Sequence, residues 1–443
     1  MWIGETFTSD AGWDHLETLV DIGNRMAGSE GERRAAAATR DALADVGARD
    51  ARLETFPVQG WTRGSSRIEA GETTQDCIAL PRSPADEVTG PLVDVGYGLP
   101  EDFADADLDG AVAMARSDVP DHHDRYVHRR EKYYYAVEAG AAGFVYRNHV
   151  PGQLPPTGSV GTEAEPVGAV PAVGVSREVG ARLARRFEGA DVTLAVEADV
   201  HDATSQNVHA ELGPDSDEQV LVTSHVDAHD IAEGAMDNGA GTATVVEVAN
   251  ALAAREGDLD TRVHFVVYGA EEVGLVGSHH HAGEADLDSV KAVVNNDGVC
   301  RGRTLKLTTN GFDALGTAAD RVADRFDHPV TVDPTCGPHS DHWPFVVAGV
   351  PGTHVMSETG DEGRGWGHTH ADTLDKLESR DLRESAILLT EYVVTVADSD
   401  FDCPGVDPAE VAAALEDENR AEGMKVTGDW PFDGNASLRS RSD

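Results

Sequence analysis

Lysine is almost absent from this chain of 443 residues, which carries a formal net charge of −45. Its 80 acidic residues far outnumber the 35 basic ones, and arginine supplies nearly all of the positive charge. So acidic a surface repels a phosphate backbone, which argues against nucleic acid as a partner. In molar salt the Debye length shrinks to about 3 Å, and self-repulsion is screened. We therefore interpret the charge as a halophilic adaptation. The lysines are Lys132, Lys291, Lys306, Lys376 and Lys425.

Cysteine and long apolar runs are also scarce. The 4 cysteines are scattered and form no Cys-x-x-Cys pair, which excludes a zinc knuckle and argues against a disulfide framework. No apolar stretch approaches the length needed to span a bilayer. The first residues show no basic region followed by an apolar run, so we expect no signal peptide. These absences predict a cytoplasmic protein with no membrane partner, and they leave the oligomeric state open.

The pattern of the chain changes three times along its length. Residues 1–60 begin with helical segments, and residues 61–198 contain short strands separated by Gly/Pro turns. Residues 199–398 alternate apolar strands with helices, the pattern of an α/β domain. Residues 399–443 are acidic and rich in turn residues, and we expect a tail there.

Polar side chains follow three apolar segments of the α/β region, where each predicted strand ends. In open α/β sheets, ligands bind beyond the carboxyl ends of the strands, so these side chains are expected to share one rim. They are His225 after Val220–Thr223, Glu271 and Glu272 after Val263–Tyr268, and Asp297 after Val290–Asn295.

Three short motifs add to this set. Asp227 stands two residues after His225, where its carboxylate can orient the imidazole of a metal ligand. Small residues fill Gly234–Gly241 and allow close backbone approach, and Asp237 within this segment could bridge two metals. The segment His368–Thr373 supplies a second histidine with a nearby aspartate. Alone, each motif is better explained as an ordinary loop, helix start or solvated acidic pair.

Together the motifs provide two histidines, two aspartates and two glutamates. A two-metal site about 3.5–4 Å across needs one bridging carboxylate, terminal His and carboxylate ligands, and a free base. Nitrogen and oxygen ligands without a thiolate fit zinc, with cobalt or manganese as substitutes.

These ordered blocks resemble metallopeptidase family 28, which includes aminopeptidase Y, bacterial leucyl aminopeptidases and glutamate carboxypeptidases. The Gly-Ala-x-Asp-Asn block favours this family over the related aminoacylase-type peptidases, and the resemblance extends from Asn207 to about Leu377. It implies a three-layer α/β/α exopeptidase domain with two zinc ions. The blocks are His225-x-Asp227, Gly234-Ala235-x-Asp237-Asn238, Glu271-Glu272, Asp297 and His368-Thr369-x-x-Asp372.

The resemblance also assigns roles to these residues. Glu271 would be the general base, and Asp227 would orient a ligand ring. A cis peptide is expected after the bridging aspartate, between Asp237 and Asn238. The implied metal ligands are His225 and Asp297 for one zinc, Glu272 and His368 for the other, and Asp237 as the bridge.

The small-residue run Glu138–Gly143 resembles the protease-associated domain that many family members carry as an insertion. This domain would be the β-rich segment 61–198, and the catalytic domain would consist of residues 1–60 and 199–398. Such a domain usually covers the active site and restricts access to it.

The chain departs from the family pattern at two points. Some members have a tyrosine directly before the last ligand histidine, where this chain has Gly367, and His370 could compete with His368 for the metal. The oxyanion then needs another donor. We predict that His339, in the turn-rich loop Gly337–Trp343, supplies it, although packing of that histidine within the loop is an equal alternative.

Other charged and histidine-rich features are interpreted more simply. His279–His281 could be a metal tract, but a solvated helix face is the preferred interpretation. Arg301 and Arg303 could bind a substrate carboxylate or pair with surface acids.

We expect a peptide substrate and, most simply, an aminopeptidase. A carboxypeptidase of the glutamate carboxypeptidase type is the alternative within the family. A glutaminyl-cyclase-like acyltransferase would hold a single zinc, and a receptor-like binding protein would hold none. The complete ligand set argues against both of these.

Overall fold

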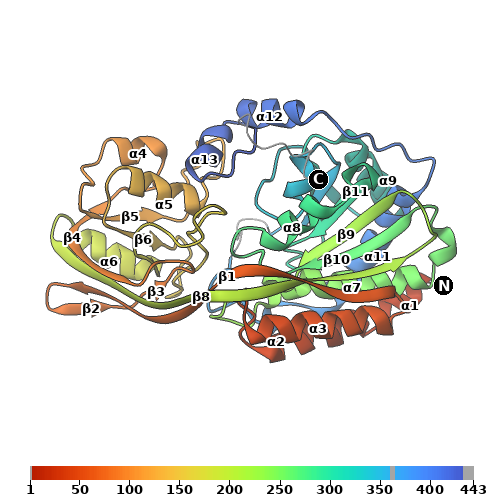
Figure 1. Cartoon of the computed structure of the whole chain (residues 1–443), viewed down its shortest axis with the longest axis horizontal. Helices are drawn as coiled ribbons and strands as arrows, with labels where there is room; N and C mark the ends of the chain where they lie inside the picture. The colour runs from red at the N-terminus through yellow and green to blue at the C-terminus, as the bar shows by residue number, and fades with distance from the viewer. Residues whose placement is uncertain (1, 360–364, 433–443) are drawn as a thin grey trace.

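Two lobes joined by a pair of long strands make up the molecule in a computed structural model, which describes residues 2–359 and 365–432 (Figure 1). The strands of both lobes belong to one 14-stranded sheet. Within the described ranges, no helix is both long enough and apolar enough to cross a bilayer.

The joining strands are β1 (Arg49–Ala70) and β8 (Asp191–Leu212), which pair antiparallel over nearly their whole length. Trp61 pairs with Val200, so the expected domain boundaries fall inside both strands instead of in linkers. The short strand predicted after Arg52 is therefore only part of a 22-residue one. Buried Phe56, Val58 and Trp61 continue along β1, but Gly60, Gly64 and Ser65 make the sequence there look like a turn, and this hid the continuation.

The larger lobe contains a mixed sheet in the order β13-β12-β14-β11-β9-β10-β8. Strands β10, β9, β11 and β14 run parallel and are covered on both faces, which explains their nearly continuous apolar sequences. The strands are β9 (Gln219–His225), β10 (Arg262–Tyr268), β11 (Val290–Asn296), β12 (Leu305–Thr308), β13 (Val330–Asp333) and β14 (Gly352–Ser357).

Helices cover both faces of this sheet and complete three layers, as expected (Figure 1). The larger core lies under α1 (Trp2–Phe7), α2 (Ala11–Ile22), α3 (Glu30–Asp45), α7 (Ala240–Ala253), α9 (Asp313–Phe326) and α11 (Ser379–Ala397). The opposite face carries α8 (Val276–Glu284) and α10 (Trp343–Val346) over a smaller core that includes Phe345 and Val266.

The smaller lobe has its own core and is more helical than its β-rich sequence pattern suggested. Four of its strands, β4 to β7, pair in parallel. Its elements are β2 (Thr73–Gln75), β3 (Ile78–Ala79), β4 (Asp86–Asp94), α4 (Pro100–Ala104), β5 (Val112–Arg116), α5 (Arg129–Glu138), β6 (Gly143–Arg147), β7 (Ala172–Val175) and α6 (Arg177–Phe187).

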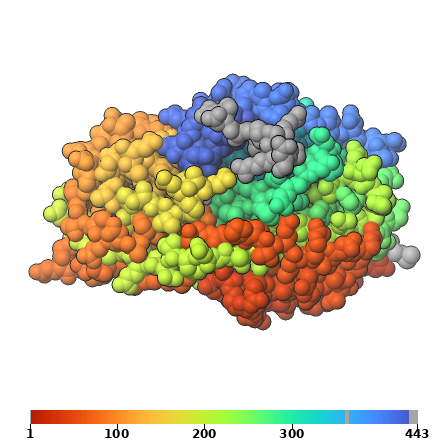
Figure 2. All heavy atoms as spheres, in the orientation of Figure 1, coloured from red at the N-terminus to blue at the C-terminus, as the bar shows by residue number. Residues whose placement is uncertain are grey.

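The C-terminal segment crosses from the larger lobe to the smaller one (Figures 1 and 2). It forms α12 (Pro408–Asp417) and α13 (Ala421–Val426), so the expectation of turns is wrong over these residues. Asp407 caps α12, and Arg130 of α5 donates to Asp429 at 2.9 Å. The segment therefore ties the two lobes together, and residues 433–443 of the predicted tail lie outside the described ranges.

Candidate active site

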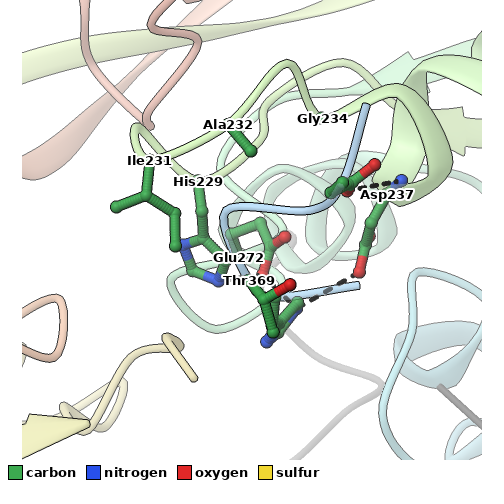
Figure 3. Close-up of a pocket in the computed structure, with 9 residues that line it drawn as sticks. His229, Ile231, Ala232, Gly234, Asp237, Glu272 and Thr369 are labelled. Carbon is green, nitrogen blue, oxygen red and sulfur yellow. Dashed lines mark hydrogen bonds and ion pairs between the residues drawn. The ribbon is translucent and has the colours of Figure 1, made fainter. Parts of the chain in front are cut away.

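Side chains predicted to bind metal converge at the carboxyl ends of β9, β10 and β11. His225 is the last residue of β9, Glu271 and Glu272 follow β10, and Asp297 follows β11. Of these residues, Glu272 lines a pocket of about 190 Å³, together with Asp237 and His368. Figure 3 labels Asp237 and Glu272 at this pocket.

Asp237 lies between two groups of ligand atoms. Its Oδ1 is 3.4 Å from Nε2 of His225, and its Oδ2 is 3.2 Å from Nε2 of His368. Asp297 Oδ1 lies 3.7 Å from the His225 ring, and Glu272 Oε2 lies 3.1 Å from the His368 ring. The implied division into two ligand groups with one bridging carboxylate is therefore the arrangement of these side chains in space.

The backbone around Asp237 is held from both sides. The peptide between Asp237 and Asn238 is cis, as expected. The Asp372 carboxylate accepts hydrogen bonds from the backbone N–H of Met236 at 2.6 Å and of Asp237 at 3.2 Å. A Cβ at Gly241 would lie 2.2 Å from Oδ1 of Asn238, so only glycine fits where the following helix begins.

Asp227 links the first ligand to the glutamate pair. Its carboxylate lies 3.4 Å from Nδ1 of His225, the position of an orienting acceptor. The same carboxylate accepts from the backbone N–H groups of Glu271 and Glu272, each at 3.1 Å. The buried Asp227 therefore contacts the ring of His225 and also holds the backbone of the loop that follows β10.

The two adjacent glutamates occupy opposite electrostatic environments. Burial raises the pKa of Glu271 well above its usual range, and the carboxylates of Glu272 and Asp297 raise it further. Burial alone would also raise the pKa of Glu272, but the rings of His229 and His368 hold it well below its usual range. Pairs of carboxyl groups whose pKa values are driven apart can take different chemical roles.

The residues present fit a pair of divalent cations. Nε2 of His225 and Oε1 of Glu272 are buried with no hydrogen-bond partner among the described residues. Buried carboxylates are costly unless cations neutralise them, and here several converge. A donor set of imidazole nitrogen and carboxylate oxygen without thiolate is the set that zinc accepts.

His229 is part of the site, although we did not identify it from the sequence. Its Nε2 lies 2.9 Å from Oε2 of Glu272, and its ring meets the ring of His368 edge to face at 4.4 Å. Its position two residues after Asp227, in the segment that follows β9, does not by itself distinguish a ligand from an ordinary loop residue.

Two buried charged residues from the N-terminal region also support the site, Glu32 on α3 and Arg25 in the segment after α2. Glu32 accepts from the Ser205 hydroxyl at 2.6 Å and from the N–H of Ala270 at 3.0 Å, and burial and the nearby Asp227 raise its pKa to about 8. The Arg25 guanidinium donates to backbone carbonyls of the loop between His225 and Asp237. Glu32 stands three residues after Ser29, the spacing of a helix cap, which indicates a helix start and no role at the site, and Arg25 has no local motif.

The loop before α10 contributes a serine instead of the predicted histidine. The Ser340 hydroxyl donates to Asp297 Oδ2 at 2.7 Å. His339 instead stacks on His128 of the smaller lobe, with ring centroids 4.3 Å apart, and is not among the residues that line the pocket. This placement corrects the prediction that His339 serves the oxyanion, since successive loop residues point in different directions.

Of the two histidines in the last motif, His368 is the one that reaches the cluster. His370 is exposed, and its Nδ1 lies 2.9 Å from the carbonyl of Ile231. The smaller lobe holds His368 directly, because the N–H of Thr157 donates to the His368 carbonyl at 2.8 Å and the Thr157 carbonyl lies 3.3 Å from its Nδ1. The inserted lobe therefore contacts one of the residues that line the pocket.

Comparison with known proteins identifies the family. The sequence profile of Peptidase family M28 matches residues 207–393, and that of the PA domain matches residues 88–183. Aminopeptidase YwaD of Bacillus subtilis is 29% identical over 394 residues, which cover 84% of this chain and 81% of that protein. The probable lipoprotein aminopeptidase LpqL of Mycobacterium tuberculosis is 28% identical over 301 residues, or 65% of this chain and 57% of LpqL.

Solved structures share the fold. A peptidase M28 precursor from Shewanella amazonensis has a TM-score of 0.76 at 23% identity, with 92% of this chain and 97% of that chain covered. The zinc aminopeptidase BSAP of Bacillus subtilis has a TM-score of 0.68 at 24% identity, covering 87% and 94% of the two chains. Fold and site together define a peptidase with an inserted lobe. Residues 207–393 form a domain of peptidase family M28, and residues 88–183 form a PA domain.

Proposed function

We propose that this peptidase is a dinuclear zinc aminopeptidase that removes single residues from the amino termini of peptides. The observation that carries the proposal is the placement of Asp237, whose two carboxylate oxygens face His225 and His368 separately. A carboxylate shared in this way is the feature that a two-metal site requires and a single-metal site does not.

Glu271 is the proposed general base. The chemistry supplied by two bound zinc ions is Lewis acidity toward the scissile carbonyl and toward water. Glu271 accepts a proton from the attacking water and returns it to the leaving amine. Its raised pKa suits the second of these steps, because a carboxyl group that holds its proton can donate it.

The negative charge of the pocket and its enclosure favour binding of the amino end of a peptide. The pocket is bordered by carboxylates of Asp237, Glu272 and Asp372, which attract a free α-ammonium group. Arg303, a candidate for binding a substrate carboxylate, instead pairs with Glu384 at 2.8 Å on the surface. The contact of Thr157 with His368 places the PA domain beside the pocket, where it would restrict access to chain ends.

A substrate panel tests the direction of cleavage. We expect aminoacyl p-nitroanilides to be hydrolysed, and their N-acetylated counterparts to be left intact. Hydrolysis of peptides blocked at the amino end, with release of the carboxyl-terminal residue, would instead identify a carboxypeptidase.

A metal count tests the dinuclear assignment. Asp237→Asn should lower the zinc bound per chain by two, because both groups lose their shared ligand. A loss of one ion would indicate a single-zinc acyltransferase of the glutaminyl-cyclase type. No bound zinc in the wild-type pocket would indicate a binding protein.

We also propose that the enzyme works in molar salt, on the basis of its net charge of −45. Unscreened repulsion between surface carboxylates destabilises the compact state, and salt removes it. Melting temperatures should therefore rise with potassium chloride concentration. A flat or falling melting temperature would refute this adaptation without affecting the assignment of the site.

A further inference from the structure

Three histidines meet on the face of the sheet that carries α8 and α10. His209 is on β8, His264 on β10 and His281 on α8, and only 1, 6 and 8% of their respective surfaces are exposed. One ring nitrogen from each lies within 4.8 Å of the others. His281 belongs to the tract that we expected on a solvated face, and this is wrong for that residue, because the helical period turns it inward while His279 stays exposed.

The hydrogen bond from His209 to β1 determines where its lone pair points. Nε2 of His209 lies 3.1 Å from Oε2 of Glu54. The pKa of Glu54 is lowered to about 2, chiefly by this hydrogen bond, so its carboxylate is ionised and accepts. Nε2 of His209 therefore carries the hydrogen, and the lone pair of Nδ1 faces the other two rings.

Hydrogen bonds to their outer nitrogens also orient the rings of His264 and His281. Nδ1 of His264 lies 3.1 Å from Oε1 of Gln219, and Arg262 donates to that same oxygen, which fixes it as the acceptor. The lone pair of His264 is therefore on Nε2. Nδ1 of His281 lies 2.9 Å from the Tyr268 hydroxyl, which leaves its Nε2 for the cluster.

Two ring nitrogens then face each other closely. Nδ1 of His209 and Nε2 of His264 are 3.0 Å apart. Two lone pairs at this distance repel each other, and a shared cation removes the repulsion. In a tetrahedral zinc site with bonds of about 2.0–2.1 Å, ligand nitrogens lie about 3.3 Å apart, so a small opening admits an ion. Burial, then the nearby His209, lowers the pKa of His281 to about 3, which keeps this ring neutral as a ligand must be.

We propose that His209, His264 and His281 form a second metal site, separate from the catalytic pocket, which binds a divalent transition metal such as zinc. Three imidazole nitrogens select zinc, cobalt or nickel over magnesium or calcium. Each ring also makes the outer hydrogen bond that metal-binding histidines make to a carboxylate, carbonyl or hydroxyl oxygen. A water molecule would complete a tetrahedral site.

This ion would act on the catalytic loop through its two ends. His264 precedes the Glu271–Glu272 pair on β10, and His281 follows it on α8. A metal bonded to both histidines closes that loop and fastens α8 to the sheet. The site is thus structural, and it stabilises the position of the general base.

A zinc count on variants of the full chain tests the proposal. Apo protein is reloaded with zinc, freed of excess ion and measured for zinc per chain. We expect His264→Gln and His281→Gln each to bind one zinc fewer than the wild type. His279→Gln, which removes the neighbouring exposed histidine, is the matched control and should bind the wild-type amount. Equal zinc in all four proteins would overturn the proposal.

Wild-type crystals provide a test that does not depend on variants folding. Anomalous scattering at the zinc edge should show a peak within bonding distance of Nδ1 of His209 and Nε2 of His264 and His281. Peaks in the catalytic pocket with none among these three rings would show a metal-free, hydrogen-bonded cluster and overturn the proposal. The reverse result would overturn the dinuclear assignment alone, so the two failures are distinguishable.

Discussion

The catalytic cluster and the three-histidine cluster both contain imidazole nitrogens but differ in charge and access. Four acidic residues converge with His225 and His368 at the strand ends, and a pocket opens beside them. In the three-histidine cluster the nearest carboxylate, Glu54, touches only an outer nitrogen, and the rings are buried in the middle of the sheet.

This difference separates a site that can perform catalysis from a site that can only bind an ion and stabilise the fold. A group of carboxylates at strand ends can bridge two ions, accept a proton and face a substrate. Imidazole rings on a covered sheet face can bind an ion but offer no carboxylate base and no room for a substrate. Histidine and carboxylate near one another are therefore insufficient to identify a catalytic site, and the number of converging charges and the opening decide it.

Removal of the general base should have the largest effect. Glu271→Gln keeps the side-chain shape but cannot accept a proton, so kcat should fall by about 10²–10⁴-fold. Zinc content should stay at the wild-type level in both clusters. The paired variant Glu272→Gln should instead lose zinc, because Glu272 Oε2 lies 3.1 Å from the His368 ring. The opposite pattern would mean that the roles of the two glutamates are exchanged.

Loss of the orienting aspartate should weaken one cluster and spare the other. Asp227→Asn retains the size of the side chain but cannot accept from both Glu271 and Glu272 while it orients His225. Removal of such a partner typically weakens metal binding by about 10–100-fold. Competition with a chelator should show weaker zinc binding in the catalytic pocket and unchanged binding at the three histidines. Equal weakening at both would indicate general unfolding.

His15, a buried histidine outside both clusters, should have a smaller effect, which is on stability and depends on pH. Burial, then the nearby Arg25, lowers the pKa of His15 from 6.5 to about 4. The unfolded chain therefore binds more protons, and the stability contributed by neutral His15 is lost as pH falls from 6.5 toward 4. The slope is at most about 1.4 kcal/mol per pH unit.

His15→Gln should remove this part of the acid sensitivity. Urea unfolding of both proteins at fixed salt, between neutral pH and pH 5, measures it. Because His15 bonds only to Thr39 at 3.0 Å, saturating zinc should not alter the difference between the two proteins. A difference that stays constant with pH would contradict the lowered pKa.

The smallest effect is expected at His339. Its ring stacks on His128 between the lobes, so His339→Phe should leave kcat and zinc content unchanged. Phenylalanine keeps an aromatic ring that can stack on His128 but has no ring nitrogen. This variant therefore tests whether His339 donates a hydrogen bond in catalysis. A fall in kcat with intact zinc would restore His339 as an oxyanion donor and would show that the loop moves when substrate binds.

The order of the metal motifs and the strands that precede them could be predicted from the sequence. Parallel strands that are covered on both faces have continuous apolar sequences. The polar residues His225, Glu271 and Asp297 mark where these apolar sequences end. The helix after Gly241 could be predicted as well, since small residues mark its start. Local composition determines these features, so one sequence was enough.

Other parts of the site required the folded structure. Glu32 and Arg25 act on a loop about 200 residues away, and only the packing of α3 and the segment after α2 against the sheet brings them there. His229 and Ser340 were overlooked, and His339 was misassigned, because loop residues alternate in direction without a regular period.

The sequence by itself determined the family, the α/β layers and the ligand types, because each depends on local patterns of apolar and charged residues. Only the tertiary structure decided which of neighbouring histidines is buried, how β1 and β8 join the lobes, and that Thr157 of the PA domain holds His368. The physical reason is that side-chain direction in a loop, and burial within a histidine tract, depend on what packs against the segment. His281 and His279 differ by two positions on one helix, and α8 lies against the sheet on only one of its sides.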